Sequence, residues 1–380
     1  MRTKPQFPCT GHIETKGFAE FLATELGESR QNLSSLTTEL REALAAPFVT
    51  LVNSGSSANL SAAILVKQRC GARRRVLVAG FSFPTTIASF TLLGFDVRLV
   101  DTEPGGFNLD PDALKTEMDG NVAAVVVTHF LGFPAQLGRI AALTREHGAM
   151  LVQDACETMG LHVEGASLYG FGDVVTHSFY HPHHLSSFGG GAVVVNSAEL
   201  HDQVQSIVHW GRACRCHYDA ARCDAPDGLN HSFWYQREGI NAEMSELNAC
   251  FARWQLRSWP AQEKRRWEHW RIWESALANI PGVQTWPAHI NISPFVFPIG
   301  VAPETYAVVT RQILGQGVEV RSLMGGAMHR HQAYQHLAHT GLKQCEAMGE
   351  RSFFVGLHQT LNTDHVHRAS AIVRQLLEVT

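Results

Sequence analysis

An acid and a histidine pair follow two short apolar runs, where their side chains could share one site. Residues 149–152 are apolar and lead to Asp154, while residues 174–180 carry Ser178 and precede a histidine pair that begins at His183. Short apolar runs are typical of buried strands, whose ends place polar side chains at the edge of a sheet. Imidazole accepts and donates protons near neutral pH, so the pattern indicates acid–base chemistry on a buried scaffold.

The elements that must position these residues alternate along the first half of the chain. We expect strands or helices at 32–44, 48–53, 75–79, 87–93, 96–100, 111–118, 122–128, 137–147 and 150–152, and later at 295–301, 317–323 and 365–377. Alternation of apolar runs with helical stretches predicts βαβ units around a mostly parallel sheet. Ser34 or Ser35 is the expected cap of the helix at 32–44.

The chain is long enough for two domains. We expect a large α/β domain over residues 1–255, which begins with an arm over about 1–30 and includes a cysteine-rich loop at 211–238. A smaller α+β domain is expected over residues 256–380.

Composition excludes several classes of protein. With 380 residues, 45% of them hydrophobic, and a net charge of −4, the chain has no electrostatic basis for binding nucleic acid or an anionic membrane. No apolar run reaches the roughly 18 residues that a membrane span needs, and residues 1–18 lack the apolar core of a signal peptide. The sequence therefore predicts a cytoplasmic protein.

The motifs resemble those of the fold-type I, pyridoxal-phosphate-dependent sugar aminotransferases, the DegT/DnrJ/EryC1/StrS family. The resemblance covers nearly the whole chain and is carried, in order, by NSGSSANL, GFSFPTT, LVQDACETMG, SFYHPHH and GINAEMSELNA. It implies a mostly parallel sheet flanked by helices, a smaller C-terminal α+β domain and a homodimer.

The resemblance also assigns cofactor contacts. Asp154 matches the acid that holds the pyridine nitrogen, and Phe83 matches the aromatic residue that stacks on the ring. Taken alone, such residues are more often helix caps, turn residues or core. The cofactor phosphate would be bound by Ser56, Ser57 and Ser178, and by Asn241 reaching across from the other chain of the dimer.

In most of the family a lysine, five residues after the serine, bonds covalently to the cofactor. Here His183 takes its place. Imidazole cannot form that bond, but it can move a proton. The histidine version resembles the dehydrases of deoxysugar biosynthesis that depend on pyridoxamine phosphate (PMP). That resemblance implies non-covalent PMP, a 4-keto-6-deoxy nucleotide sugar as substrate, and His183 as the base while the hydroxyl at sugar carbon 3 departs.

Four of the eight cysteines have a distinctive spacing. They are Cys156, Cys214, Cys216 and Cys223, and the last interval is one residue shorter than in the iron-sulfur-containing dehydrases that they resemble. The resemblance implies a 2Fe-2S cluster. Zinc is the rival for four thiolates, and free thiols are the third alternative. Because no flavin or nicotinamide fingerprint is present, electrons would come from a separate reductase.

Two other functions fit parts of this pattern. A PMP-dependent dehydratase without a cluster, or an aminotransferase-like enzyme, would share the histidine but would not need the four cysteines. A non-catalytic regulatory homologue could keep the fold after losing the lysine, although the presence of Asp154, Ser178 and Asn241 argues against it.

Overall fold

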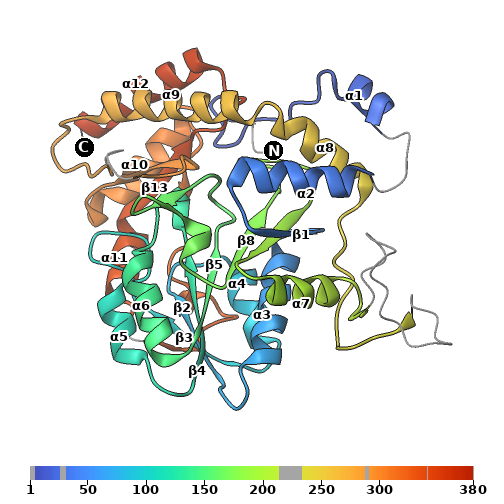
Figure 1. Ribbon diagram of the computed structural model, residues 1–380. Coiled ribbons are helices and arrows are strands. Elements are labelled where there is room, and N and C mark those ends of the chain that lie inside the picture. Colours follow the sequence, from blue (N-terminus) through green and yellow to red (C-terminus); the bar gives the residue numbers. More distant parts are fainter. Residues whose placement is uncertain (1–4, 26–30, 214–232, 287–290, 340, 380) are drawn as a thin grey trace.

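A mostly parallel sheet of eight strands lies at the centre of the protein (Figure 1). The structure, a computed structural model, describes residues 5–25, 31–213, 233–286, 291–339 and 341–379. The strand order is β1-β9-β8-β5-β4-β2-β3-β12, and β9 runs antiparallel to both β8 and β1. The strands are β1 Phe48–Val52, β2 Arg75–Ala79, β3 Asp96–Val100, β4 Val122–Thr128, β5 Met150–Asp154, β8 Val174–Ser178, β9 Gly191–Val195 and β12 Ala338–His339.

Helices cover both faces of this sheet. Alternate side chains of one strand enter different cores: Val76 and Val78 pack on one face and Leu77 and Ala79 on the other, as expected for a parallel sheet buried on both sides. The first core contains apolar residues of α3 Gly55–Arg69, α4 Pro84–Thr91 and α7 Ala198–Val208. The second contains those of α2 Gln31–Leu44, α5 Pro111–Glu117, α6 Leu137–His147 and α8 Glu246–Leu256.

The C-terminal part adds a small antiparallel sheet in the order β10-β13-β11. Its strands are β10 Val296–Gly300, β11 Arg321–Ser322 and β13 Ser352–Gly356, and its helices are α9 Trp259–Leu277, α10 Pro303–Gly315, α11 Lys343–Arg351 and α12 Thr363–Glu378. The chain also forms the helix α1 Phe18–Glu25 and the short strands β6 His162–Val163 and β7 Ala166–Ser167. Helices α8 and α9 meet near residue 255, where the domain boundary stays a prediction.

Most of the expected elements are present, and two expectations are wrong. Ser34 and Ser35 do not cap α2, because they lie inside it; instead the Glu246 carboxylate accepts a hydrogen bond from the Asn32 amide at 3.1 Å. The expected strand at 317–323 is reduced to β11. Of the loop predicted at 211–238, residues 214–232 lie outside the described residues.

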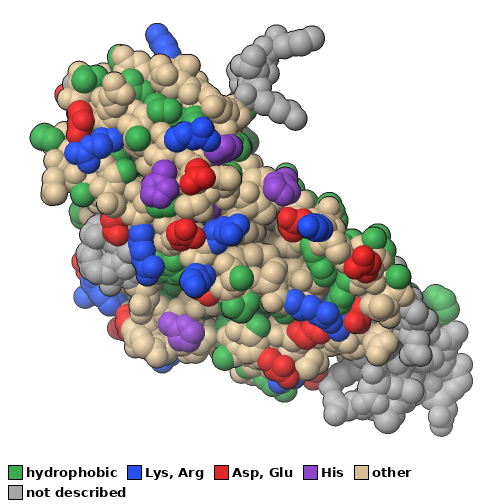
Figure 2. Space-filling model, turned by 90° about the horizontal axis from the view of Figure 1, so that it is seen from above, with side chains coloured by type: hydrophobic (Ala, Val, Ile, Leu, Met, Phe, Trp, Pro, Cys, Tyr) green, Lys and Arg blue, Asp and Glu red, His purple; other side chains and the backbone are tan. Residues whose placement is uncertain are grey.

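The surface carries charges of both signs. On the face seen in Figure 2, acidic and basic side chains are interspersed. The chain as a whole has nearly equal numbers of the two, 35 acidic and 31 basic residues. Within the described part of the chain, no helix is long and apolar enough to cross a bilayer.

Candidate active site

A cavity of about 690 Å³ opens at the carboxyl ends of β4, β5 and β8, where α3 begins. Ligands of open α/β sheets bind at this edge, and the volume lies in the range of small-molecule sites. The cavity brings together six of the residues selected from the sequence: Ser56, Phe83, Asp154, Cys156, Ser178 and His183.

The N-terminus of α3 forms a cradle on the cavity wall. Ser54 caps the helix by accepting a hydrogen bond from the Ser57 amide at 3.0 Å. A Cβ atom on Gly55 would lie 2.6 Å from the Ser178 Cβ, so only glycine fits between the helix and β8. Ser56 lies beside this position on the cavity wall. Amides at a helix N-terminus bind phosphate groups, so the cradle fits the phosphate of a cofactor.

Two predicted phosphate ligands do not line the cavity. Ser57 donates from its hydroxyl to Asn53 Oδ1 at 2.5 Å, which ties it to the helix cap. Asn241 is exposed and forms a β-bridge with His209. Its predicted role toward the other chain of a dimer stays a prediction.

Asp154 is held by a buried network of hydrogen bonds. Its Oδ2 accepts from the Thr86 hydroxyl at 2.5 Å and from the Asn59 amide at 3.0 Å. Its Oδ1 accepts from the Cys156 amide at 3.1 Å, and Thr176 donates to Asn59 Oδ1 at 2.6 Å. These bonds fix the carboxylate on the cavity wall.

The two side chains that hold this carboxylate, Asn59 and Thr86, were not predicted from the sequence. Asn59 is a polar residue on the buried side of α3, among Ala58, Ala62 and Ala63. That position was a usable signal, because a buried polar side chain needs a partner. Thr86 gave no comparable signal.

The two neighbouring histidines have different surroundings. His183 lines the cavity, and its ring stacks on Phe295 with centroids 5.4 Å apart and planes 10° apart. Burial, and secondly the charge of Arg266, lower the pKa of His183 to about 4. The imidazole is therefore neutral near pH 7 and can accept a proton. His184 forms a 3.0 Å hydrogen bond with the Ser293 hydroxyl and does not line this cavity.

Glu157 is a titratable group on the cavity wall that the sequence interpretation did not select. Its Oε2 accepts a hydrogen bond from the Leu131 amide at 2.6 Å. Burial raises the pKa of Glu157 to about 8, so this side chain is mostly uncharged at neutral pH.

Buried neutral histidines make the fold sensitive to acid. Burial lowers the pKa of His129 to about 4, and its ring forms a 3.1 Å hydrogen bond with Gln153. An unfolded chain protonates histidine below about pH 6.5, so between these values the unfolded state binds more protons. The contribution of His129 to the free energy of unfolding is therefore present above pH 6.5 and is lost as the pH drops toward 4.

Chemical denaturation should show this acid sensitivity. We expect His129 alone to contribute a loss of about 2 kcal/mol in unfolding free energy between pH 6.5 and 5. The His129→Gln variant should show a smaller loss over the same interval. An equal loss in both proteins would mean that His129 is not the source.

The candidate cluster ligands are only partly within the described residues. Cys156 is a half-buried thiol on the cavity wall. Cys214, Cys216 and Cys223 lie outside the described residues, and no group of three or more metal-binding side chains is present among the residues that the structure describes. The 2Fe-2S cluster stays a prediction.

The sequence of the chain matches the model of a known protein family. The model of the DegT/DnrJ/EryC1/StrS aminotransferase family matches residues 8–374. The chain belongs to this family. A solved structure has the same fold: an E. coli GDP-4-keto-6-deoxy-D-mannose-3-dehydratase with bound hydrated PLP superposes with a TM-score of 0.87 at 19% identity, covering 98% of this chain and all of that one. The expected fold, fold-type I, is therefore confirmed.

Curated relatives include sugar dehydratases. The chain is 32% identical over 332 residues to a dTDP-4-dehydro-2,6-dideoxy-D-glucose 3-dehydratase of Saccharopolyspora spinosa, covering 81% of this chain and 72% of the relative. It is 24% identical over 347 residues to a GDP-4-keto-6-deoxy-D-mannose 3-dehydratase of Yersinia pseudotuberculosis, covering 88% of each.

Proposed function

We propose that this enzyme is a PMP-dependent 3-dehydrase that removes the carbon-3 hydroxyl of a 4-keto-6-deoxy nucleotide sugar. The observation that carries the proposal is that His183, which the motif resemblance puts at the position of the family's lysine, lines the same cavity as Asp154. The printed functions of the two curated relatives support the same reaction and substrate class.

The cavity fits PMP. The cradle formed by Gly55, Ser56 and Ser178 would hold the phosphate, Phe83 would face the ring, and Asp154 would keep the pyridine nitrogen protonated. When bound, PMP supplies an amine that condenses with a ketone and a ring that accepts electrons. No lysine lines the cavity among the described residues, and we propose that PMP binds there without a covalent bond.

His183 would perform the proton transfer. Its neutral imidazole can accept a proton beside the bound sugar, while the Phe295 ring limits its rotation and excludes water from that side. Loss of the hydroxyl and its replacement by hydrogen consume two electrons and two protons and release one water. A separate reductase would supply the electrons.

We assign the electron relay to a 2Fe-2S cluster, which Cys156, Cys214, Cys216 and Cys223 would hold. The support is their spacing and the position of the Cys156 thiol on the cavity wall. Such a cluster transfers one electron at a time.

Cys156→Ser tests this assignment. The variant should lose most of the visible absorbance of anaerobically purified protein, because a hydroxyl is a poor ligand for cluster iron. Cys70→Ser is the matched control, since Cys70 is half-buried at the end of α3 and does not line the cavity. A colourless wild-type protein without iron and sulfide would contradict the cluster and favour the cluster-free dehydratase.

We further propose a homodimer. Tyr180 is 63% exposed on the cavity wall, and Phe188, in the same connection between β8 and β9, is 62% exposed. Large exposed aromatic side chains are typical of interfaces. A second chain would cover them and bring Asn241 to the phosphate cradle.

Sedimentation of the wild-type protein and of Asn241→Ala tests the dimer. Both should sediment as dimers, and Asn241→Ala should bind PMP more weakly, since it removes a phosphate contact without disturbing the helices. A wild-type monomer that binds PMP tightly would exclude the shared site.

Product analysis tests the function itself. PMP-loaded protein, a flavin- or iron-sulfur-containing reductase and a 4-keto-6-deoxy nucleotide sugar should give a product lighter by one oxygen atom in mass spectrometry. An amino sugar as product would identify an aminotransferase. Unchanged sugar, with PMP bound, would favour the non-catalytic homologue.

A further inference from the structure

A buried arginine lies behind the wall of the cavity. Arg266, on α9, has an exposed fraction of 1% and does not line the cavity. It donates hydrogen bonds to five acceptors, all of them uncharged oxygens. Burial lowers the pKa of Arg266 to about 9, so the guanidinium stays charged at neutral pH. A buried charge is costly unless its donors are satisfied, and here main-chain carbonyls satisfy four of the five bonds.

The acceptors of Arg266 belong to three segments, and each segment places a residue in the cavity. Nη2 donates to the carbonyls of Pro182 and His183, both at 3.2 Å. Nη1 donates to the carbonyl of Phe295 at 3.0 Å, and Nε donates to the side chain of Gln359 at 2.8 Å. His183, Phe295 and His358, the neighbour of Gln359, all line the cavity. One planar group thus joins three otherwise separate parts of the wall.

The His183 ring depends on these contacts for its orientation. Its Nδ1 is buried and has no hydrogen-bond partner among the described residues, so this nitrogen is not oriented by a carboxylate as in a catalytic triad. The ring is instead stacked on Phe295. Arg266 holds the carbonyls of both stacked residues, and therefore fixes the imidazole and its neighbour relative to each other.

We propose that Arg266 is a positioning residue for His183. By holding the carbonyls of His183 and Phe295, it keeps the imidazole stacked on the Phe295 ring in the cavity wall. The inference rests on the proposed role of His183 as the base. Misplacing a catalytic group by a small distance lowers the rate of the chemical step while leaving remote binding contacts intact. The cofactor contacts Gly55, Ser56, Asp154 and Ser178 lie on α3, β5 and β8, and none of them accepts any of the five hydrogen bonds of Arg266.

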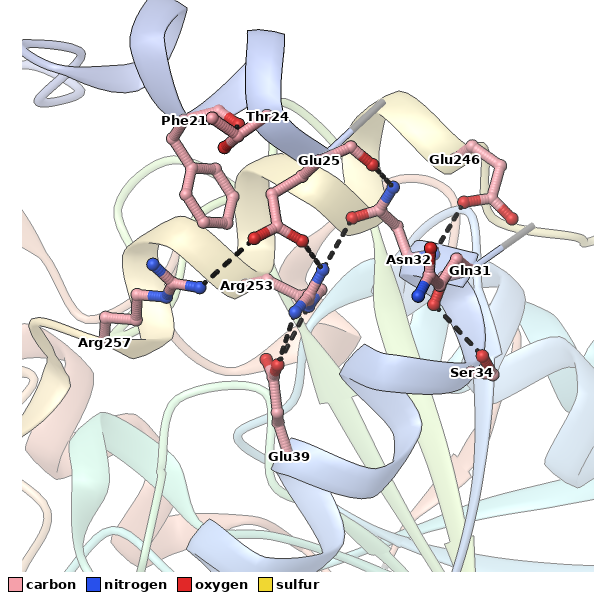
Figure 3. A network of polar contacts seen from close by, with 10 residues as sticks. All are labelled: Phe21, Thr24, Glu25, Gln31, Asn32, Ser34, Glu39, Glu246, Arg253 and Arg257. Carbon is pink, nitrogen blue, oxygen red and sulfur yellow. Dashed lines mark hydrogen bonds and ion pairs between the residues drawn. The ribbon is translucent and has the colours of Figure 1, made fainter. Parts of the chain in front are cut away.

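The chain offers a matched control in a second buried arginine. Arg253, on α8, is 8% exposed and donates to Glu39 at 2.9 Å, to Glu25 at 2.7 Å and to Asn32 at 2.8 Å (Figure 3). This network ties α1 and α2 to α8 and does not line the cavity. Replacing Arg253 therefore measures the general effect of losing a buried arginine.

The experiment compares Arg266→Met, Arg266→Lys and Arg253→Met. At equal folded fraction, Arg266→Met should lower kcat by at least about tenfold with little change in KM or PMP affinity, because only the chemical step loses its geometry. Arg266→Lys should recover part of kcat, since an ammonium group can satisfy some of the carbonyls. Arg253→Met should lower the melting temperature and keep kcat.

A second measurement does not depend on activity. Hydrogen exchange of the peptide over residues 179–188 should be faster in Arg266→Met than in the wild type, and unchanged in Arg253→Met. If Arg266→Met does not fold, Phe295→Leu takes its place and should lower kcat by a similar factor. Unchanged kcat and exchange in the Arg266 variants, or unchanged kcat in Phe295→Leu, would overturn the positioning role. Full activity of a His183 variant would instead overturn the proposed function.

Discussion

Replacing His183 with asparagine should lower the rate of carbon-3 dehydration by roughly 10²- to 10⁴-fold, the range typical of losing a general base. Asparagine has a similar size, but its amide cannot accept a proton near neutral pH. PMP affinity should change little, because the phosphate cradle and Asp154 lie on other elements. Dehydration can be followed as loss of ¹⁸O from carbon 3 of the substrate, and PMP binding by its absorbance.

His184→Asn is the control for this prediction. His184 forms a hydrogen bond with the Ser293 hydroxyl and does not line the cavity. The His184→Asn variant should therefore lose thermal stability and keep most of the dehydration rate. If His184→Asn lost the reaction and His183→Asn kept it, the assignment of the base within the pair would be reversed.

The second large effect is expected at Asp154. Asp154→Asn should lower the dehydration rate on the order of 10³-fold, since removing one preorganised electrostatic group has effects of this size. The amide cannot keep a pyridine nitrogen protonated. It also places an NH₂ group where the carboxylate now accepts hydrogen bonds from Thr86, Asn59 and the Cys156 amide. We therefore expect weaker PMP binding as well.

Asp173 provides the comparison for Asp154. Its carboxylate accepts a hydrogen bond at 2.8 Å from the amide of Leu151, which lies near the start of β5, the strand that ends at Asp154. Asp173 does not line the cavity. Asp173→Asn should therefore keep PMP affinity and rate. Equal PMP affinity and equal rate in Asp154→Asn and the wild type would exclude the ring-nitrogen role.

The central strands were predictable because their short apolar sequences favour buried strands over other secondary structure. Residues 75–79 and 122–128 are almost entirely apolar or β-branched and lie between helical stretches, and they form β2 and β4 within the predicted bounds. The helix at 137–147 also matches α6. Local pattern is sufficient where both faces of a strand are buried.

Features that depend on distant contacts were not predictable. The amide that starts α2 bonds to Glu246, 214 residues further along the chain, so a local search for a cap selected Ser34 and Ser35 incorrectly. The role of Arg266 depends on three segments that only the fold brings together. Similarly, the stacking of His183 on Phe295 brings together two residues that are far apart in the sequence.

The proposed dehydration is tested most directly with a 4-keto-6-deoxy nucleotide sugar labelled with ¹⁸O only at carbon 3. In ordinary water, without a reductase, PMP-loaded wild-type protein should release the label from recovered substrate, and His183→Asn should not. Dehydration and its reversal exchange this oxygen, whereas transamination at carbon 4 leaves it in place. Full retention of the label by wild-type protein with PMP bound, together with formation of an amino sugar, would contradict the proposal.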